Sequence, residues 1–251
     1  MKIEVIHIGD ELLTGEIDPY PTRLIEMVRA KGANVNLVTI VRDNYDDIMR
    51  LLRSAEEGGT DFLIITGGLG PTLDDITRQV VADFLAVPLE LRKDAVNWFV
   101  ESIKERYGAK PVMTPENELM AMVPSGAKAL RNITGAAAGI EATWKGMRIF
   151  CLPGFPKEML PMFEEYILPL IEGEEVFEKE IRGKRGESTM APLFQEIVRT
   201  YKVRIASLPN ENWIEEGNRI IIKGYDPVVV EKAAARLAEL IEQSEDEFIL
   251  E

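Results

Sequence analysis

Apolar residues lie in short runs along the first two thirds of this chain, and amphipathic stretches separate the runs. The first three apolar runs cover residues 3–9, 35–41 and 62–66 and predict strands, the third of them typical of a strand buried on both faces. The stretches with apolar residues at helical spacing cover residues 20–31, 45–57, 74–85 and 92–107, the second of them capped by Asp43 or Asn44. Because strands that alternate with helices form parallel βαβ units, we expect an α/β fold.

The pattern changes after residue 107, where Gly and Pro separate shorter apolar segments. These segments predict strands at residues 120–123, 127–130, 139–143 and 147–152, followed by a helix at 156–168. We therefore expect a mixed, mostly parallel sheet in a first domain of residues 1–170. A small α+β domain is expected over residues 171–251, with strands at 176–181, 203–206 and 219–223 and helices at 187–200 and 227–243.

The junction after residues 62–66 is the richest in chemical information. Three glycines within residues 67–70 let main-chain amides approach a ligand closely, and the helix that follows presents a positive N-terminus, so a phosphate group is the natural ligand. The adjacent carboxylates of Asp74 and Asp75 would repel a phosphate unless a divalent cation lay between them. The junction thus indicates metal-assisted phosphate chemistry. The alternative is that Asp75 and Thr72 form a capping box.

A second strand-to-helix junction, residues 152–158, offers another wall for an anionic ligand, with Pro156 suited to the first helical position. The formal net charge of -14 and the isoelectric point near 4.7 argue against broad binding of nucleic acid or anionic membrane. Cys151 and His7 are the single cysteine and histidine, and both are expected to be structural. With no leader pattern and no apolar run of eighteen residues, we expect a cytoplasmic protein.

Four ordered motifs carry a resemblance to a known family. They are residues 9–17 (GDELLTGEI), 66–77 (TGGLGPTLDDIT), 132–139 (NITGAAAG) and 152–158 (LPGFPKE). Together they resemble the CinA family, whose shared domain is similar to the molybdopterin-binding domains of MoaB, MogA, gephyrin and MoeA. The resemblance implies a three-layer α/β/α sandwich with the ligand at the strand ends, followed by a small KH-like domain. It also implies a short form without the nicotinamide-nucleotide deamidase domain of longer relatives.

The resemblance implies a reaction at a pyrophosphate: divalent-metal-dependent hydrolysis of ADP-ribose or a similar diphosphate. Its alternatives are a non-catalytic protein that binds molybdopterin or a nucleotide, and molybdopterin adenylyl transfer in cofactor biosynthesis. Asp10, Glu11 and Asp75 are the expected catalytic residues, and Asp10, Asp74 and Asp75 are expected to hold Mg²⁺, Mn²⁺ or Co²⁺. The expected ligand-binding residues are Gly9, Thr14, Thr66, Gly67, Gly68, Leu69, Gly70, Thr72, Thr77, Asn132, Gly135, Gly139, Pro153 and Gly154.

Several alternatives stay open at this point. Glu11 is either a base or a helix-start carboxylate, and Gly135–Gly139 is either a pocket wall or a turn whose small residues allow close packing. Residues 183–186 (GKRG) match the loop with which KH domains clamp nucleic acid, although the surrounding domain is acidic. The same basic turn could instead reach the pocket of a neighbouring subunit. A homodimer is the default expectation for a soluble enzyme.

Overall fold

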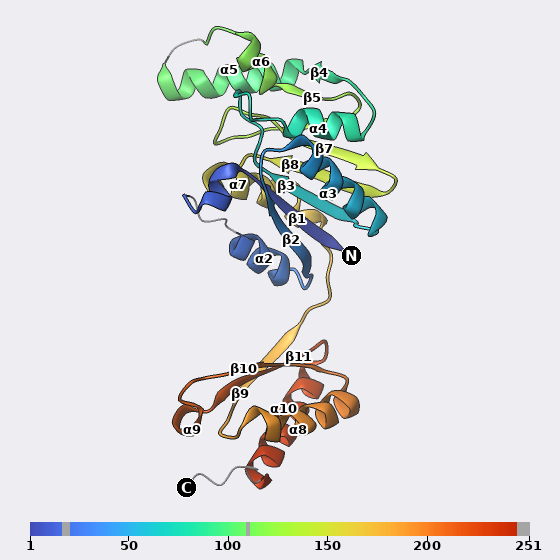
Figure 1. The fold of residues 1–251 in the computed structure, drawn as a ribbon, viewed down its shortest axis with the longest axis vertical. Helices are drawn as coiled ribbons and strands as arrows, with labels where there is room; N and C mark the ends of the chain where they lie inside the picture. Colours follow the sequence, from blue (N-terminus) through green and yellow to red (C-terminus); the bar gives the residue numbers. More distant parts are fainter. Residues whose placement is uncertain (17–20, 109–110, 245–251) are drawn as a thin grey trace. The chain divides into compact units, whose positions relative to one another are not determined.

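The computed structural model describes residues 1–16, 21–108 and 111–244, and the chain divides into two compact units, Met1–Gly173 and Glu174–Glu251 (Figure 1). The first unit contains a six-stranded sheet in the order β2-β1-β3-β8-β7-β6. Its strands are β1 Ile3–Ile8, β2 Val35–Val41, β3 Phe62–Thr66, β6 Lys128–Leu130, β7 Gly139–Trp144 and β8 Met147–Leu152. The pairs from β2 to β8 are parallel and the last two pairs are antiparallel, which confirms the mixed, mostly parallel sheet.

Helices cover both faces of this sheet, as the alternation of strands and helices predicts (Figure 1). On one face, α2 (Pro21–Ala30) and α7 (Pro156–Tyr166) share a core with Val5, Ile64 and Phe150. On the other face, α3 (Tyr45–Glu57), α4 (Thr77–Phe84) and α5 (Lys93–Tyr107) share a second core with Leu63, Ile65 and Ile149. Successive strand residues therefore bury their side chains in opposite layers, and the expected three-layer α/β/α architecture is confirmed.

The structure differs from the predicted elements at several points. Helix α4 begins at Thr77 rather than at residue 74, so Asp74 and Asp75 belong to the loop before it. The strand expected at residues 120–123 is β5 (Met122–Pro124), which pairs with β4 (Leu89–Leu91) outside the main sheet. Five short elements that the periodicity did not reveal are α1 (Asp10–Thr14), β4, α6 (Pro115–Leu119), the 3-10 turn Leu168–Leu170 and α9 (Trp213–Glu216). Segments of three to five residues are too short for a helical period to emerge.

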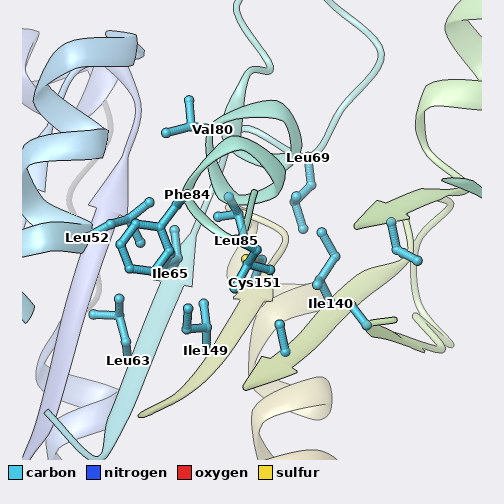
Figure 2. Close-up of a cluster of buried hydrophobic side chains, with 14 of the residues drawn as sticks. Leu52, Leu63, Ile65, Leu69, Val80, Phe84, Leu85, Ile140, Ile149 and Cys151 are labelled. Carbon is cyan, nitrogen blue, oxygen red and sulfur yellow. The ribbon is translucent and has the colours of Figure 1, made fainter. Parts of the chain in front are cut away.

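The core beneath the glycine loop includes a residue of the loop itself. Leu69 is 2% exposed and lies in the same cluster as Val80, Leu85, Ile140 and Cys151 (Figure 2). Its side chain therefore anchors the loop to the layer that contains α4, and only its main chain is left to meet a ligand.

The second unit has its own sheet and core. Its strands β9 (Phe177–Gly183), β10 (Arg204–Leu208) and β11 (Asn218–Gly224) form an antiparallel sheet in the order β10-β11-β9. Two long helices, α8 (Glu187–Tyr201) and α10 (Pro227–Gln243), share buried residues with this sheet, and a short helix α9 (Trp213–Glu216) lies between β10 and β11 in the chain. This is the α+β arrangement that the sequence predicts.

Candidate functional site

The chain connections of β1 and β3 mark the place where a ligand pocket is expected. These neighbouring parallel strands pair His7 with Thr66 near their carboxyl ends. The chain leaves β1 for α2 on one face of the sheet and leaves β3 for α4 on the other face. Such a point opens a crevice beyond the strand ends, and ligands of open α/β sheets bind there.

A pocket of about 610 Å³ lies at this position. Segments that follow β1, β2, β3 and β8 line it, together with residues from α5 to β7. The predicted site residues among those lining it are Gly9, Glu11, Thr66, Gly67, Gly68, Leu69, Gly70, Asp74, Asp75, Pro153 and Gly154. The predicted residues that do not line it are Asp10, Thr14, Thr72, Thr77, Asn132, Gly135 and Gly139. The two strand-to-helix junctions thus form the pocket, as the sequence predicts.

The glycine loop has only part of its main chain free for a ligand. The amide of Gly67 donates to the Leu152 carbonyl at 3.0 Å, and the amide of Gly70 donates to Asp75 Oδ1 at 2.7 Å. Across the described residues, no protein acceptor takes the amides of Gly68 and Leu69. Of the four amides of residues 67–70, only these two are therefore left for a ligand, because the fold itself uses the others.

Asp75 lines the pocket, but its carboxylate folds back onto its own loop. Besides the Gly70 amide, it accepts the Thr72 amide at 2.9 Å and the Thr72 hydroxyl at 2.5 Å. A Cβ atom at Gly70 would lie 2.4 Å from Asp75 Oδ2, so a larger residue there would displace this carboxylate. The capping box expected as the alternative is not formed at the helix, because α4 begins at Thr77 and its N-cap, Ile76, makes no side-chain cap. Asp75 instead stabilises the turn before α4. Thr72 contributes to that turn and is not a pocket residue.

The sequence argument did not identify Asp43 as a site residue. It follows the end of β2, lines the pocket beside Glu11 and Asp74, and accepts the Asp10 amide at 3.2 Å. Burial, and then repulsion from Glu11, Asp10 and Asp74, raise the pKa of Asp43 to about 6, although the Asp10 amide opposes this rise. Its position after a strand end was the signal that could have identified it.

The predicted metal ligands are not arranged as a metal site. In the described parts of the chain, no three His, Cys, Asp or Glu side chains are grouped so that they could hold a metal ion. Asp10 is exposed and does not line the pocket, while Asp75 is bound to its own loop. The set Asp10, Asp74 and Asp75 is therefore not preformed, because the Asp75 carboxylate accepts the amides of Gly70 and Thr72 instead.

Asn132 and its glycines hold the loop after β6 against α7. The Asn132 side chain is buried and donates to Glu158 Oε2 at 2.7 Å and to the Ala137 carbonyl at 3.2 Å. A Cβ atom at Gly135 would lie 1.9 Å from Glu158, and one at Gly139 would lie 2.6 Å from Met162. Close packing, the alternative left open above, explains both glycines, and Ala136 and Ala137 line the pocket in their place.

Thr14 and Thr77 make local contacts instead of reaching the pocket. The Thr14 hydroxyl is exposed and donates to the Glu11 carbonyl within α1 at 3.3 Å. Thr77 is fully buried, and its hydroxyl donates to the Gly67 carbonyl at 2.9 Å. Thr77 is thus a residue of the loop's support, and the prediction that it contacts ligand directly has no counterpart in the pocket lining.

His7 and Cys151 are buried, as expected. His7 Nδ1 lies 2.7 Å from Thr66 Oγ1 in a hydrogen bond, and burial lowers the pKa of His7 to about 4. Cys151 is buried in the core of Figure 2, and this burial raises the pKa of its thiol to about 12. At neutral pH both groups are uncharged, and Cys151 cannot act as a nucleophile.

The pocket lining is acidic. Its carboxylates are those of Glu11, Glu16, Asp43, Asp74, Asp75 and Glu158. Among the described residues that line it, Arg106 is the only lysine or arginine, and its guanidinium donates to the Thr134 carbonyl. The groups in the pocket that can bind an anion are therefore mainly main-chain amides, and acidic side chains surround these amides.

The basic turn of the second unit is largely occupied by local contacts. Arg185 Nε donates to the Ser244 carbonyl at 2.9 Å, at the end of α10. Arg182 lies 3.6 Å from the carboxylate of Glu180 on the same strand. Lys184 is exposed, and it pairs with no carboxylate of the described residues. The Arg185 guanidinium is thus held by main-chain carbonyls, and binding of nucleic acid by this turn stays a prediction.

None of the helices within residues 1–16, 21–108 and 111–244 has both the length and the apolar character of a membrane span.

Comparison with known proteins places this pocket in context. Residues 4–173 match the model of the family described as "Probable molybdopterin binding domain". A protein of Pyrococcus abyssi is 36% identical over 239 residues, covering 92% of this chain and 94% of its own length. A CinA-like protein of Geotalea daltonii is 36% identical over 172 residues, which are 68% of this chain and 41% of that protein.

A solved structure supports the same relationship. The crystal structure of the protein CinA from Thermoplasma acidophilum is similar, with a TM-score of 0.59 and 30% identity. The match covers 68% of this chain and 99% of that one.

Proposed function

This chain belongs to the CinA-like branch of the molybdopterin-binding domain family, and from that membership we propose that its pocket binds a phosphorylated pterin or nucleotide. The ligand's phosphate would accept hydrogen bonds from the amides of Gly68 and Leu69. Its ring system would lie along the apolar wall of Leu12, Met120 and Met159. The volume of about 610 Å³ is in the range that encloses a ligand of this size.

One observation carries the proposal: Gly68 and Leu69, two consecutive residues whose amides are unused by the described part of the fold, line the pocket at the switch point of the sheet. An amide that faces a pocket and has no protein partner is available to an oxygen acceptor. Phosphate oxygens accept from several donors at once, and charge assistance makes such bonds stronger than those of a neutral ligand.

A second candidate is divalent-metal-dependent hydrolysis of ADP-ribose or a similar diphosphate. The carboxylates of Glu11, Asp43 and Asp74, which share the pocket wall, favour it. Mg²⁺ needs only one or two protein carboxylates when the substrate's phosphates supply further ligands, so a preformed cage is not required. The ion would offset the repulsion between those carboxylates and the diphosphate. Molybdopterin adenylyl transfer would use the same pocket and the same diphosphate contacts.

Two measurements test these proposals. Calorimetry measures the binding of ADP-ribose and of molybdopterin, each with and without Mg²⁺, Mn²⁺ or Co²⁺. A parallel assay measures release of AMP. Binding without AMP release under any ion supports a binding protein. AMP release that depends on a metal supports the hydrolase. Absence of binding by either ligand, with and without metal, contradicts the proposed function.

Asp74→Asn separates the two candidates further. If the pocket binds phosphate without a metal, loss of this carboxylate removes repulsion, and affinity rises about threefold to tenfold. If a metal bridges the two groups, the same variant loses activity instead. Asp46→Asn, an exposed aspartate outside the pocket lining, is the matched control and is expected to change neither quantity.

The homodimer and the cytoplasmic location expected from the sequence stay predictions. Light scattering coupled to gel filtration measures the first, and cell fractionation measures the second.

A further inference from the structure

The first two residues of α4 donate hydrogen bonds to all four carbonyls of the glycine loop, residues 67–70. The Thr77 hydroxyl and amide donate to the carbonyls of Gly67, at 2.9 Å, and Gly68, at 3.2 Å. The Arg78 guanidinium donates to the next two carbonyls, those of Leu69 and Gly70, the latter at 3.3 Å. Two consecutive buried residues, 0% and 3% exposed, thus bind four consecutive carbonyls.

The orientation of these carbonyls determines where the free amides point. The described chain contains no cis peptide bond, and in a planar trans peptide the N–H points opposite to the C=O of the preceding residue. Because the Gly67 and Gly68 carbonyls are directed at Thr77, the amides of Gly68 and Leu69 are directed away from α4. Thr77 therefore sets the direction of the two amides that have no partner among the described residues.

Thr77 packs closely against the main chain of the glycine loop. A Cβ atom at Gly68 would lie 2.1 Å from Thr77 Oγ1, so the hydroxyl sits directly against the Gly68 main chain. Gly68 has a φ of 65°, a conformation that side-chain-bearing residues rarely adopt. The loop and the threonine thus fit only as a pair.

Arg78 fixes the second half of the loop at an electrostatic cost. Burial lowers the pKa of its guanidinium to about 10, so the side chain stays charged at neutral pH. Asp75, which braces the Gly70 amide, is the acidic group whose charge opposes this shift. Arg78 Nε is buried without a partner among the described residues, which adds to this cost.

We propose that Thr77 is a positioning residue, which holds the carbonyls of Gly67 and Gly68 so that the amides of Gly68 and Leu69 point at the phosphate of the ligand, while Arg78 holds the second half of the loop in place. The proposal rests on the proposed function, because it assigns the loop's order to phosphate binding. The competing explanation is that both residues serve only to start α4 and to fill the core. The two explanations differ in what happens to phosphate affinity when the fold is intact.

Thr77→Val and Thr77→Ser form a matched pair for the test. Valine keeps the size of the side chain and loses the hydroxyl, whereas serine keeps the hydroxyl and loses a methyl group. The full chain, labelled with ¹⁵N, is titrated with inorganic pyrophosphate while the amide signals of Gly68 and Leu69 are followed. We expect Thr77→Ser to bind as the unaltered protein does and Thr77→Val to bind about tenfold more weakly.

Amide order parameters of the ligand-free proteins provide a readout that does not depend on the ligand. In the unaltered protein and in Thr77→Ser we expect rigid amides at Gly68 and Leu69, with values near ~0.85. In Thr77→Val we expect values below ~0.6 at these two positions and unchanged values in α4 itself. Loss of order throughout α4 would instead support the helix-start explanation and overturn the proposal.

The remaining outcomes also decide. Thr77→Val with unaltered amide order and unaltered affinity overturns the positioning role. If pyrophosphate moves neither amide signal in the unaltered protein, the phosphate part of the proposed function fails, and the order parameters alone judge whether Thr77 directs these amides. Arg78→Met and Arg78→Lys repeat the comparison for the second half of the loop; if Arg78→Met does not fold, the threonine pair still gives the answer.

Discussion

At the scale of single residues, the glycine loop is shaped by positions where a neighbouring side chain fills the space next to a glycine. Gly68 and Thr77 illustrate this, because the threonine hydroxyl occupies the space that a Gly68 side chain would need. Asp75 and Gly70 illustrate it again in the following turn. A glycine at such a position therefore indicates a steric requirement. Whether the polar residue beside it contacts the ligand or supports the loop depends on the partners that the fold gives it.

Gly68→Ala is expected to lower the free energy of unfolding by about 3 kcal/mol, from the positive φ and from the clash with Thr77. Gly59→Ala is the matched control, since Gly59 has a similar φ of 67° and a Cβ atom added there would meet nothing within 4 Å among the described residues. The control should cost about 1 kcal/mol. Urea denaturation measures both, and equal losses would show that the clash is relieved by movement of Thr77.

Asp43 predicts a pH dependence of stability. Its folded pKa of about 6 lies above the ordinary value of 3.8, so the folded state binds the proton more tightly than the unfolded state. Its contribution to stability is therefore greatest at low pH and is lost as pH rises from about 4 to 6.

Asp43→Asn should raise the free energy of unfolding at pH 8 by about 1 kcal/mol, a value reduced for solvent screening, and should give no gain at pH 4. Denaturation curves at the two pH values check this. A gain of equal size at both would mean that the charge of Asp43 is not the cause.

At the scale of elements, strands with long apolar runs are the most predictable parts of the chain. The runs at residues 35–41, 62–66 and 147–152 have the same bounds in the structure as in the prediction. Helix starts are less predictable, because a cap or turn several residues long can delay them. Helix α4 begins three residues late because Asp75 and Thr72 first form a turn.

The N-terminus of α10 provides a prediction at this scale. Asp226 caps it by accepting the amides of Val228 at 2.8 Å and Val229 at 3.2 Å. Asp226→Ala should therefore lower the free energy of unfolding by about 1 kcal/mol. Asp226→Asn, which keeps the acceptor, should lower it by only about 0.3 kcal/mol. Thermal unfolding compares the two variants, and an equal loss in both would assign the effect to charge.

At the scale of the whole molecule, no cluster of buried apolar side chains among the described residues is shared between the units: the first unit contains two clusters and the second contains one. The first unit uses its topology to form the pocket, since the helices after β1 and β3 leave on opposite faces. In the second unit, Ile220 and Ile222 of β11 lie fully buried among α8 and α10. Each unit thus buries apolar surface without help from the other's core.

Ile222→Ala should destabilise the second unit by about 2 to 5 kcal/mol, because it leaves a cavity in that core. Ile221→Ala, at the adjacent and only half-buried position, should cost less than about 1.5 kcal/mol. Hydrogen exchange in the full chain, followed at β11 and at β1, measures both effects. Exchange that accelerates equally in β1 would contradict separate cores.

The order of residues was enough to predict the α/β class, the three-layer order of the first unit, the α+β second unit and the two junctions that form the pocket. Most of these features follow from local patterns, because the spacing of apolar residues indicates whether a strand is buried on its faces or a helix along one stripe. The layer order came from the four motifs and their resemblance to a known family.

Which polar groups are free to act became visible only once the chain was folded. Folding turned Asp75 onto its own loop, brought Asp43 to the pocket wall and assigned Asn132 to packing. The physical reason is that a carboxylate or an amide bonds to whichever partner the fold brings near, and these partners come from different elements or from turns whose geometry the pattern does not contain.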